Sequence, residues 1–197
     1  MNVSCETSEK LDRYIALLEK WNPKINLVST SSLKDAASRH ILDSLQILQL
    51  QKHVNSNYVD LGSGGGFPGA VIAIALAQSN PSANVTLIES DHRKCVFLRT
   101  VSRETNTPFK VLAERIEDVK PQAADVLTAR ALAPLTNLLS FTQRHMSPTG
   151  TAFFPKGETW EEEVAACQKQ WNFQCKVHKS VTSPNAVILE IGDVSRA

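Results

Sequence analysis

The spacing of apolar residues divides the chain into two parts that differ in their expected structure. In the first part, apolar side chains recur three or four residues apart, from Leu11 to Leu18 and again from Leu33 to Leu48, and such positions share one face of a helix. Pro23 is expected to break the first helix, and Ser31 or Ser32 can cap the second. Residues 1–52 are therefore predicted to form a small helical cap.

From Tyr58 onward, short apolar segments alternate with segments of helical pattern. The predicted strands are Tyr58–Leu61, Val85–Glu89, Phe109–Leu112, Asp125–Thr128, Thr151–Phe154, Phe173–Lys179 and Ala186–Ile191. The predicted helices follow Pro68 and Asp91 and span Pro134–Met146 and Glu158–Gln170. This alternation implies crossover connections and a mostly parallel sheet covered on both faces. The last two strands are expected to pair as an antiparallel hairpin. The whole chain is expected to form a single α/β domain, in which residues 57–197 make up the Rossmann-like core.

The segment VDLGSGGGFPG, from Val59 to Gly69, has the composition of a buried strand, a turn with few side chains and the start of a helix. Its glycines allow the backbone to turn sharply and to approach a ligand closely. Pro68 suits the first turn of a helix, and the apolar run from Ala70 to Ala77 predicts that this helix is buried. Such a turn directs unpaired backbone N–H groups and the positive end of a helix dipole toward a nucleotide-like ligand.

The register of the glycines bears on which ligand is bound. Gly64, Gly66 and Gly69 match the G-x-G-x-x-G pattern of dinucleotide sites, but the glycine that ends the strand is Gly62. Counted from Gly62, the pattern is preceded by Asp60, whose carboxylate is expected to point into the site and would repel a pyrophosphate. S-adenosylmethionine has no phosphate and carries a cationic amino acid group, so we favour it as the cofactor. No G-K-[ST] follows the glycines, which argues against a P-loop ATPase.

Glu89 ends the second predicted strand, where an acidic residue in such folds meets the ribose of the ligand. A carboxylate that accepts hydrogen bonds from the ribose hydroxyls contributes about 1.5–3 kcal/mol. The alternative is that Glu89 only caps the following helix, together with Ser90 and Asp91.

Composition and charge indicate the cellular compartment of the protein and limit the kinds of partner it can bind. The 197 residues carry a net charge of +1, so any contact with nucleic acid must concentrate positive charge on one face. The four cysteines are scattered and predict neither a metal site nor disulfides. The polar N-terminus is unlike a secretory signal, and the longest apolar run is much shorter than the about 20 residues that span a bilayer. A cytoplasmic protein without membrane contact is expected.

Several motifs, in the same order, resemble those of the RsmG (GidB) family. They are WNPKINLV (21–28), RHILDSL (39–45), the glycine loop, LIESDHRKCVFL (87–98), AERIED (113–118), TARALAPL (128–135) and PKG (155–157). The resemblance covers nearly the whole chain, although the segment before WNPKINLV is shorter than is common in the family. It implies a Rossmann-like class I methyltransferase that transfers a methyl group from S-adenosylmethionine to N7 of a guanosine in the decoding-region loop of 16S ribosomal RNA. The partner would be this RNA or the small ribosomal subunit, and the enzyme is expected to be a monomer.

The resemblance also implies positions in the site. Ile116 and Glu117 would flank the adenine of the cofactor, and Arg130 would face its methyl-donor end. The resemblance places Gly62 and Phe67 in the cofactor pocket, with Glu89, Ser90 and Asp91 around the ribose. With the glycine-loop residues, the expected cofactor-binding set is Asp60, Gly62, Gly64, Phe67, Glu89, Ser90, Asp91, Ile116, Glu117 and Arg130.

The residues after the fourth predicted strand bear on the atom that is methylated. Enzymes that methylate the exocyclic amine of adenine or cytosine usually carry an Asn-Pro-Pro-Tyr-like motif there, and cytosine C5 enzymes need a cysteine nucleophile. This chain has TARALAPL instead. Methylation of guanine N7 needs neither that motif nor a cysteine nucleophile, because N7 has a free lone pair and loses no proton. We therefore assign no general base and expect Arg130 or Lys156 to donate to guanine O6; the alternative for Arg130 is an ion pair with Asp125 or Glu117.

Candidate RNA contacts fall into two groups of basic residues. The first, part of which is expected to be only the solvated face of a helix, comprises Arg93, Lys94, Arg99, Arg103, Lys110 and Arg115. The second comprises Arg39, His40, Arg130, Arg144, His145 and Lys156. His40 and Asp43 lie one turn apart, so a structural pair that ties the cap to the sheet is the alternative for His40.

Three other functions compete with rRNA methylation on the sequence alone. A dinucleotide-dependent oxidoreductase would use the G-x-G-x-x-G match, and a ribosome-assembly factor could keep the fold without turnover. The polar anchors Asp60 and Glu89 argue against the assembly factor. A small-molecule methyltransferase is the third, and it is weakened by the lack of an apolar substrate lid.

Overall fold

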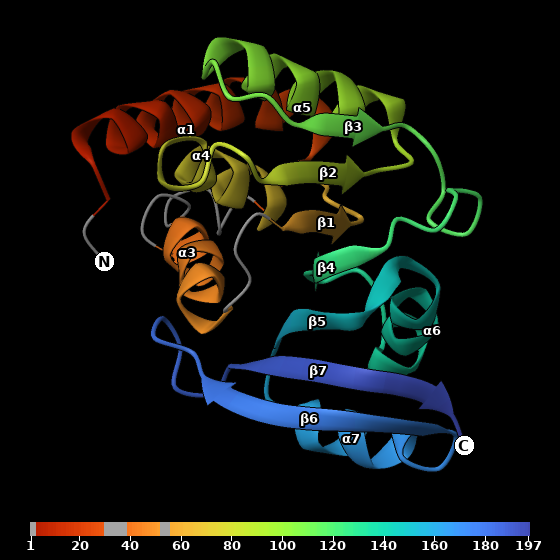
Figure 1. Cartoon of the computed structure of the whole chain (residues 1–197). Coiled ribbons are helices and arrows are strands. Elements are labelled where there is room, and N and C mark those ends of the chain that lie inside the picture. Colours follow the sequence, from red (N-terminus) through yellow and green to blue (C-terminus); the bar gives the residue numbers. More distant parts are fainter. Residues whose placement is uncertain (1–2, 30–38, 52–55) are drawn as a thin grey trace.

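The computed structural model describes residues 3–29, 39–51 and 56–197. Within these residues seven strands form one sheet in the order β3-β2-β1-β4-β5-β7-β6 (Figure 1). The strands are β1 (Asn57–Leu61), β2 (Asn84–Ile88), β3 (Lys110–Leu112), β4 (Ala124–Ala129), β5 (Met146–Lys156), β6 (Trp171–Lys179) and β7 (Val187–Arg196). β1 to β5 pair in parallel, whereas β7 is antiparallel to both β5 and β6. The predicted fold class, a mostly parallel sheet with an antiparallel C-terminal hairpin, is confirmed.

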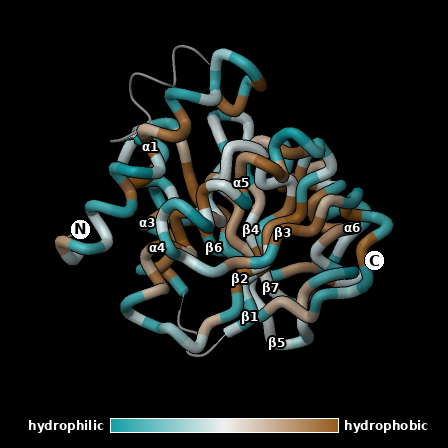
Figure 2. Tube along the Cα trace, turned by 90° about the horizontal axis from the view of Figure 1, so that it is seen from above, coloured by the Kyte–Doolittle hydropathy of each residue, from teal (hydrophilic) through white to brown (hydrophobic). Residues whose placement is uncertain are grey.

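Helices cover both faces of this sheet (Figure 1). One face carries α1 (Cys5–Ile25), α3 (Ile41–Leu50), α4 (Gly69–Ser79) and α5 (His92–Glu104), and the other carries α6 (Leu135–His145) and α7 (Trp160–Cys167). Alternate strand residues supply the two cores: in β1, Tyr58 belongs to the first cluster of buried residues and Val59 to the second. Figure 2 shows hydrophobic segments along the strands and inner helices, with hydrophilic segments mostly at the periphery.

The helical cap packs into the same core as the sheet. Tyr14 and Leu18 of α1 are fully buried and belong to one apolar cluster with Tyr58 and Val126 of the strands. Of the second predicted helix, α3 is confirmed, while the start that Ser31 or Ser32 would cap lies outside the described residues. No helix in the described ranges has the length and apolar character needed to cross a membrane.

The element boundaries that differ most from the sequence-based expectation are those of α1, β5 and β7. α1 continues past Pro23 by two residues, to Ile25. Proline lacks only one backbone N–H, and the helix ends within one turn of it. The side-chain oxygen of Asn22 then accepts hydrogen bonds from the backbone N–H groups of Leu27 and Val28, at 2.8 and 2.9 Å. β5 and β7 are longer than predicted, since β7 pairs with β5 on one side and along nearly its whole length with β6 on the other.

Candidate active site

The glycine loop joins β1 to α4 at the carboxyl end of the parallel strands. Gly62 and Gly66 have φ angles of +61° and +96°. Residues other than glycine rarely adopt such angles, because their Cβ clashes with the backbone. A Cβ at Gly62 would lie 2.4 Å from Cδ1 of Leu132, so this glycine also permits close contact with the segment after β4. Pro68 directly precedes the first residue of α4, as the sequence pattern indicated. The loop therefore brings backbone from β1 and β4 together around one space.

That space is a cavity of about 560 Å³, within the range of small-molecule sites. Eight of the ten expected cofactor-binding residues line it: Gly62, Gly64, Phe67, Glu89, Ser90, Ile116, Glu117 and Arg130. Lys94 and Arg115, expected as RNA contacts, line it as well. The cavity thus joins the ends of β1, β2 and β4 with the segment that follows β3, the place where an open α/β sheet binds its ligand.

Asp60 does not line the cavity, although its carboxylate was expected to point into it. The carboxylate is buried behind the loop, where Oδ1 accepts a hydrogen bond from Thr128 Oγ1 at 2.7 Å and Oδ2 accepts one from the Gly69 N–H at 3.3 Å. Asp60 therefore fixes the start of α4 against β4 and supports the loop from behind. Burial raises the pKa of this carboxyl to about 6, and the hydrogen bond from Thr128 opposes that rise.

The raised pKa of Asp60 predicts a dependence of stability on pH. Between about pH 4, where an unfolded aspartate titrates, and about pH 6, the folded protein binds a proton that the unfolded chain does not. The free energy of unfolding should therefore fall as the pH rises through this window, by up to about 3 kcal/mol. Asp60→Asn is expected to remove this component. Urea unfolding of both proteins across the window measures it, and equal slopes in the two would contradict the prediction.

Glu89 lies at the rim of the cavity and ties two loops together. Its Oε2 accepts a hydrogen bond from the Gly64 N–H, and its Oε1 accepts one from the Asp91 N–H, both at 2.8 Å. The helix cap itself is Asp91, whose Oδ1 accepts from the Arg93 N–H at 2.8 Å. Asp91 accordingly lies at the start of α5 and not among the residues that line the cavity. Each Glu89 oxygen keeps a further lone pair that a ribose hydroxyl could use.

Replacing Glu89 with glutamine should weaken cofactor binding. The amide removes the negative charge, and its NH₂ group places a donor against a backbone N–H of the loop. We expect the Kd for S-adenosylhomocysteine to rise about 10- to 100-fold, the equivalent of about 1.5–3 kcal/mol for a charged hydrogen bond. Isothermal titration calorimetry measures this change. Glu104→Gln, an exposed glutamate paired with Arg103 on α5, is the matched control; an unchanged Kd in Glu89→Gln would refute the role.

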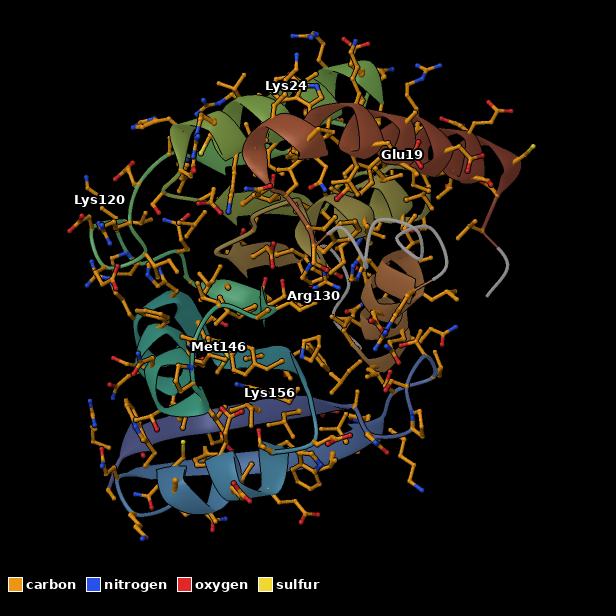
Figure 3. All side chains as sticks on the ribbon, turned by 180° about the vertical axis from the view of Figure 1, so that it is seen from behind. Glu19, Lys24, Lys120, Arg130, Met146 and Lys156 are labelled. Carbon is orange, nitrogen blue, oxygen red and sulfur yellow. The ribbon has the colours of Figure 1, made fainter. Side chains whose placement is uncertain are left out.

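Arg130 directly follows β4, is half-buried and lines the cavity. Figure 3 labels its side chain on the ribbon. Its guanidinium carbon is 4.9 Å from the centre of the Phe67 ring, and its Nη1 is 2.7 Å from Nδ1 of His40. Burial lowers the pKa of Arg130 from its ordinary value. The alternative of an ion pair with Asp125 or Glu117 is wrong, because neither carboxylate lies within ion-pair distance among the described residues.

Lys156, the second candidate for guanine contact, does not reach the cavity. Its ammonium lies 2.8 Å from Glu163 Oε2 and donates to the Ala133 carbonyl at 3.2 Å. The same Glu163 oxygen accepts from the Leu135 N–H at 2.7 Å. The expectation for Lys156 is corrected accordingly: it joins α7 to the start of α6, and a carboxylate neutralises its charge.

Of the two expected RNA contacts on α6, His145 is structural, whereas Arg144 is exposed. His145 is fully buried, its Nε2 lies 2.9 Å from the Ile116 carbonyl oxygen, and burial lowers its pKa. Arg144 donates to the Val119 carbonyl at 2.9 Å. His145 cannot touch RNA without unfolding of the helix end. Both side chains bind the segment after β3, which forms one wall of the cavity, and Arg144 stays a candidate for RNA contact.

The cavity also contains residues that the sequence analysis did not select. Leu27 lies in the WNPKINLV motif, and Asn137 and Phe141 lie one turn apart on α6. The i, i+4 spacing of Asn137 and Phe141 was the available signal, because such positions share a helix face. It could not be separated from an ordinary core-facing stripe on the sequence alone.

Comparison with known proteins decides the family. A family model described as "rRNA small subunit methyltransferase G" (GidB) matches residues 7–191. The chain belongs to this family. The Ribosomal RNA small subunit methyltransferase G of Ruegeria sp. is 48% identical over all of this chain and 95% of its own length, and that of Paracoccus denitrificans is 46% identical over all of both. The expected cofactor of this methyltransferase, S-adenosylmethionine, is confirmed with the family, and the oxidoreductase alternative is set aside.

Solved structures support the fold. A TehB-like SAM-dependent methyltransferase from Corynebacterium glutamicum has a TM-score of 0.61 at 10% identity, with 92% of this chain and 98% of that chain covered. M. jannaschii TYW2 in complex with AdoMet has a TM-score of 0.58 at 14% identity, with 80% and 76% covered. At these identities the likeness concerns the fold alone.

Proposed function

We propose that this chain methylates N7 of a guanosine in the decoding-region loop of 16S ribosomal RNA, with S-adenosylmethionine as the methyl donor. The observation that carries the proposal is the position of Arg130 beside the cavity, where its guanidinium lies against Phe67 and no carboxylate of the described residues lies within ion-pair distance of it. A half-buried cation of this kind suits a base that presents an oxygen acceptor next to the reacting nitrogen. Guanine, with O6 beside N7, is such a base.

The residues of the chain act by binding and alignment. When bound, S-adenosylmethionine supplies the methyl group, and its positive charge passes from sulfur to the base as the C–S bond breaks and the N7–C bond forms. Glu89 and the glycine loop hold the ribose side, with the loop geometry fixed by the Glu89–Gly64 hydrogen bond. No proton leaves N7, so no residue is needed as a general base. Proximity and orientation can lower such a barrier by about 7–11 kcal/mol.

Arg130 is assigned to O6 of the guanine. If the guanidinium bonded both O6 and N7, as in ordinary guanine recognition, the reacting lone pair would be blocked. A donor to O6 alone orients the base and leaves N7 free. The face of Phe67, 4.9 Å from the guanidinium carbon, restricts the directions in which Arg130 can donate.

The RNA would approach over the rim of the cavity. Lys94 and Arg115 line it, whereas the exposed Arg93, next to Lys94 on α5, is paired with Asp91 at 3.0 Å. Lys94 and Arg115 supply phosphate contacts next to the site, and the substrate is either free 16S rRNA or the small subunit. We further propose a monomer that acts in the cytoplasm.

The test is to incubate the purified protein and S-adenosylmethionine with 16S rRNA and small subunits from a strain that lacks the enzyme. Nuclease digestion and mass spectrometry then identify the modified nucleoside and its fragment. The expected product is N7-methylguanosine in the decoding-region fragment. Another methylated nucleoside, or N7-methylguanosine elsewhere, would overturn the specific assignment.

A further inference from the structure

His40 and Arg130 meet although 90 residues separate them in the chain. His40 immediately precedes α3, and Arg130 follows the last residue of β4. Nδ1 of the imidazole is 2.7 Å from Nη1 of the guanidinium, and the centre of the imidazole ring is 5.1 Å from that of Phe67. Phe67 therefore contacts both side chains, and the three form one cluster at the edge of the cavity.

The chemistry of this pair fixes the role of each partner. A guanidinium has only donors, so the His40 Nδ1 must be the acceptor, and the ring carries its proton on Nε2. In the part of the chain that the structure describes, no carboxylate lies within ion-pair distance of Arg130. The direction of the guanidinium is therefore set by the His40 acceptor together with the Phe67 face, and not by an ion pair.

The helix that follows His40 is itself anchored at a second place. Asp43 Oδ1 accepts hydrogen bonds from the hydroxyls of Thr182 and Ser180, and Gln46 Oε1 accepts one from the Val181 N–H at 3.2 Å. These contacts join α3 to the loop between β6 and β7. His40 and Asp43, considered above as an alternative structural pair, bind different partners: His40 contacts Arg130, and Asp43 contacts the two hydroxyls. Because α3 is fixed, the His40 acceptor has a defined position relative to β4.

We propose that His40 is a positioning residue for methyl transfer, which acts by holding the Arg130 guanidinium in the direction that reaches the target base. The inference rests on the proposed function of Arg130. It predicts that loss of the acceptor lowers the rate of the chemical step more than it weakens cofactor binding. It also predicts that an acceptor restored at the same atom position recovers the rate.

Three substitutions of His40 test this. In His40→Asn the side-chain oxygen is attached to Cγ, as Nδ1 is in histidine, so it can accept from Arg130; in His40→Gln the oxygen is one atom further away; His40→Leu has no acceptor. Gln49→Ala, an exposed polar position on the same helix, is the control. The measurements are single-turnover methylation of small subunits or 16S rRNA at saturating S-adenosylmethionine, the Kd for S-adenosylhomocysteine, and the Tm.

We expect His40→Leu to slow methyl transfer at least 10-fold, His40→Asn to recover most of the rate, and His40→Gln to recover less. The Kd and Tm should change little in His40→Asn and in Gln49→Ala. The inference is overturned if His40→Leu turns over at the wild-type rate, if His40→Asn is as slow as His40→Leu, or if the rate falls only in proportion to Kd or Tm. Mass spectrometry of the wild-type product decides the proposed function separately, because a product other than N7-methylguanosine would refute that function whatever the His40 series shows.

Discussion

Gly66→Ala is expected to abolish binding of S-adenosylhomocysteine and to destabilise the fold by roughly 2–6 kcal/mol. The φ angle of Gly66 is +96°, and holding a side chain there costs about 1–3 kcal/mol. A Cβ at this position would also lie 2.9 Å from Ala70 Cβ and 2.9 Å from the Tyr14 hydroxyl, and overpacking of this kind costs about 1–3 kcal/mol more. Relief of these contacts requires movement of the loop, which forms one wall of the cavity.

Urea unfolding and calorimetric titration with S-adenosylhomocysteine measure the two effects of Gly66→Ala. Gly192→Ala is the matched control, because a Cβ built there meets no atom within 4 Å and the backbone is not left-handed. The control should keep wild-type binding and stability. Wild-type affinity in Gly66→Ala would mean that the loop accommodates a side chain, and the geometric argument for it would fail.

Arg130→Ala should lower kcat/KM for rRNA methylation about 10- to 100-fold. The expected loss corresponds to one charged hydrogen bond to the base, about 1.5–3 kcal/mol. Arg130→Lys keeps the charge but not the planar array of donors, and its amine lacks the flat face that lies against Phe67. It should therefore recover only part of the activity.

Methyl incorporation into small subunits at several RNA concentrations measures the effect. Arg13→Ala provides the control. The Arg13 guanidinium donates to the Glu104 carbonyl, which joins α1 to α5, and Arg13 does not line the cavity. Normal methylation and normal cofactor affinity in Arg130→Ala would remove Arg130 from the mechanism. The His40 series would then lose its premise as well.

The sheet could be predicted from the sequence because its signals are local. The alternation of short strand-like segments with helical segments located all seven strands, and the glycine loop placed the cofactor end of the sheet. Glu89 could be assigned to this edge because it follows β2 directly, and parallel strands end at the same edge.

The roles of individual charged residues were harder to predict, because each depends on a partner far away in the chain. Asp60 faces Thr128 across two neighbouring strands, and His145 meets Ile116 across a loop and a strand. The sequence shows that such a side chain is polar. It does not show whether a residue distant in the chain forms its hydrogen bonds and so keeps it out of the cavity. Arg130 was placed correctly beside the cavity, whereas its acceptor, His40, was visible only once α3 and β4 were brought together.

Truncation of the chain before the C-terminal hairpin of β6 and β7 would affect the protein differently from a substitution in the cavity. Every described residue that lines the cavity lies between Leu27 and Phe141, so a chain that stops after β5 already contains these residues. It would nevertheless leave the β5 edge without β7 and Asp43 without Thr182. An exposed strand edge promotes aggregation and degradation. Nonsense or frameshift alleles in the last part of the gene should therefore abolish activity by lowering the amount of protein in the cell, although they delete no residue of the cavity. Immunoblotting would detect this loss of protein.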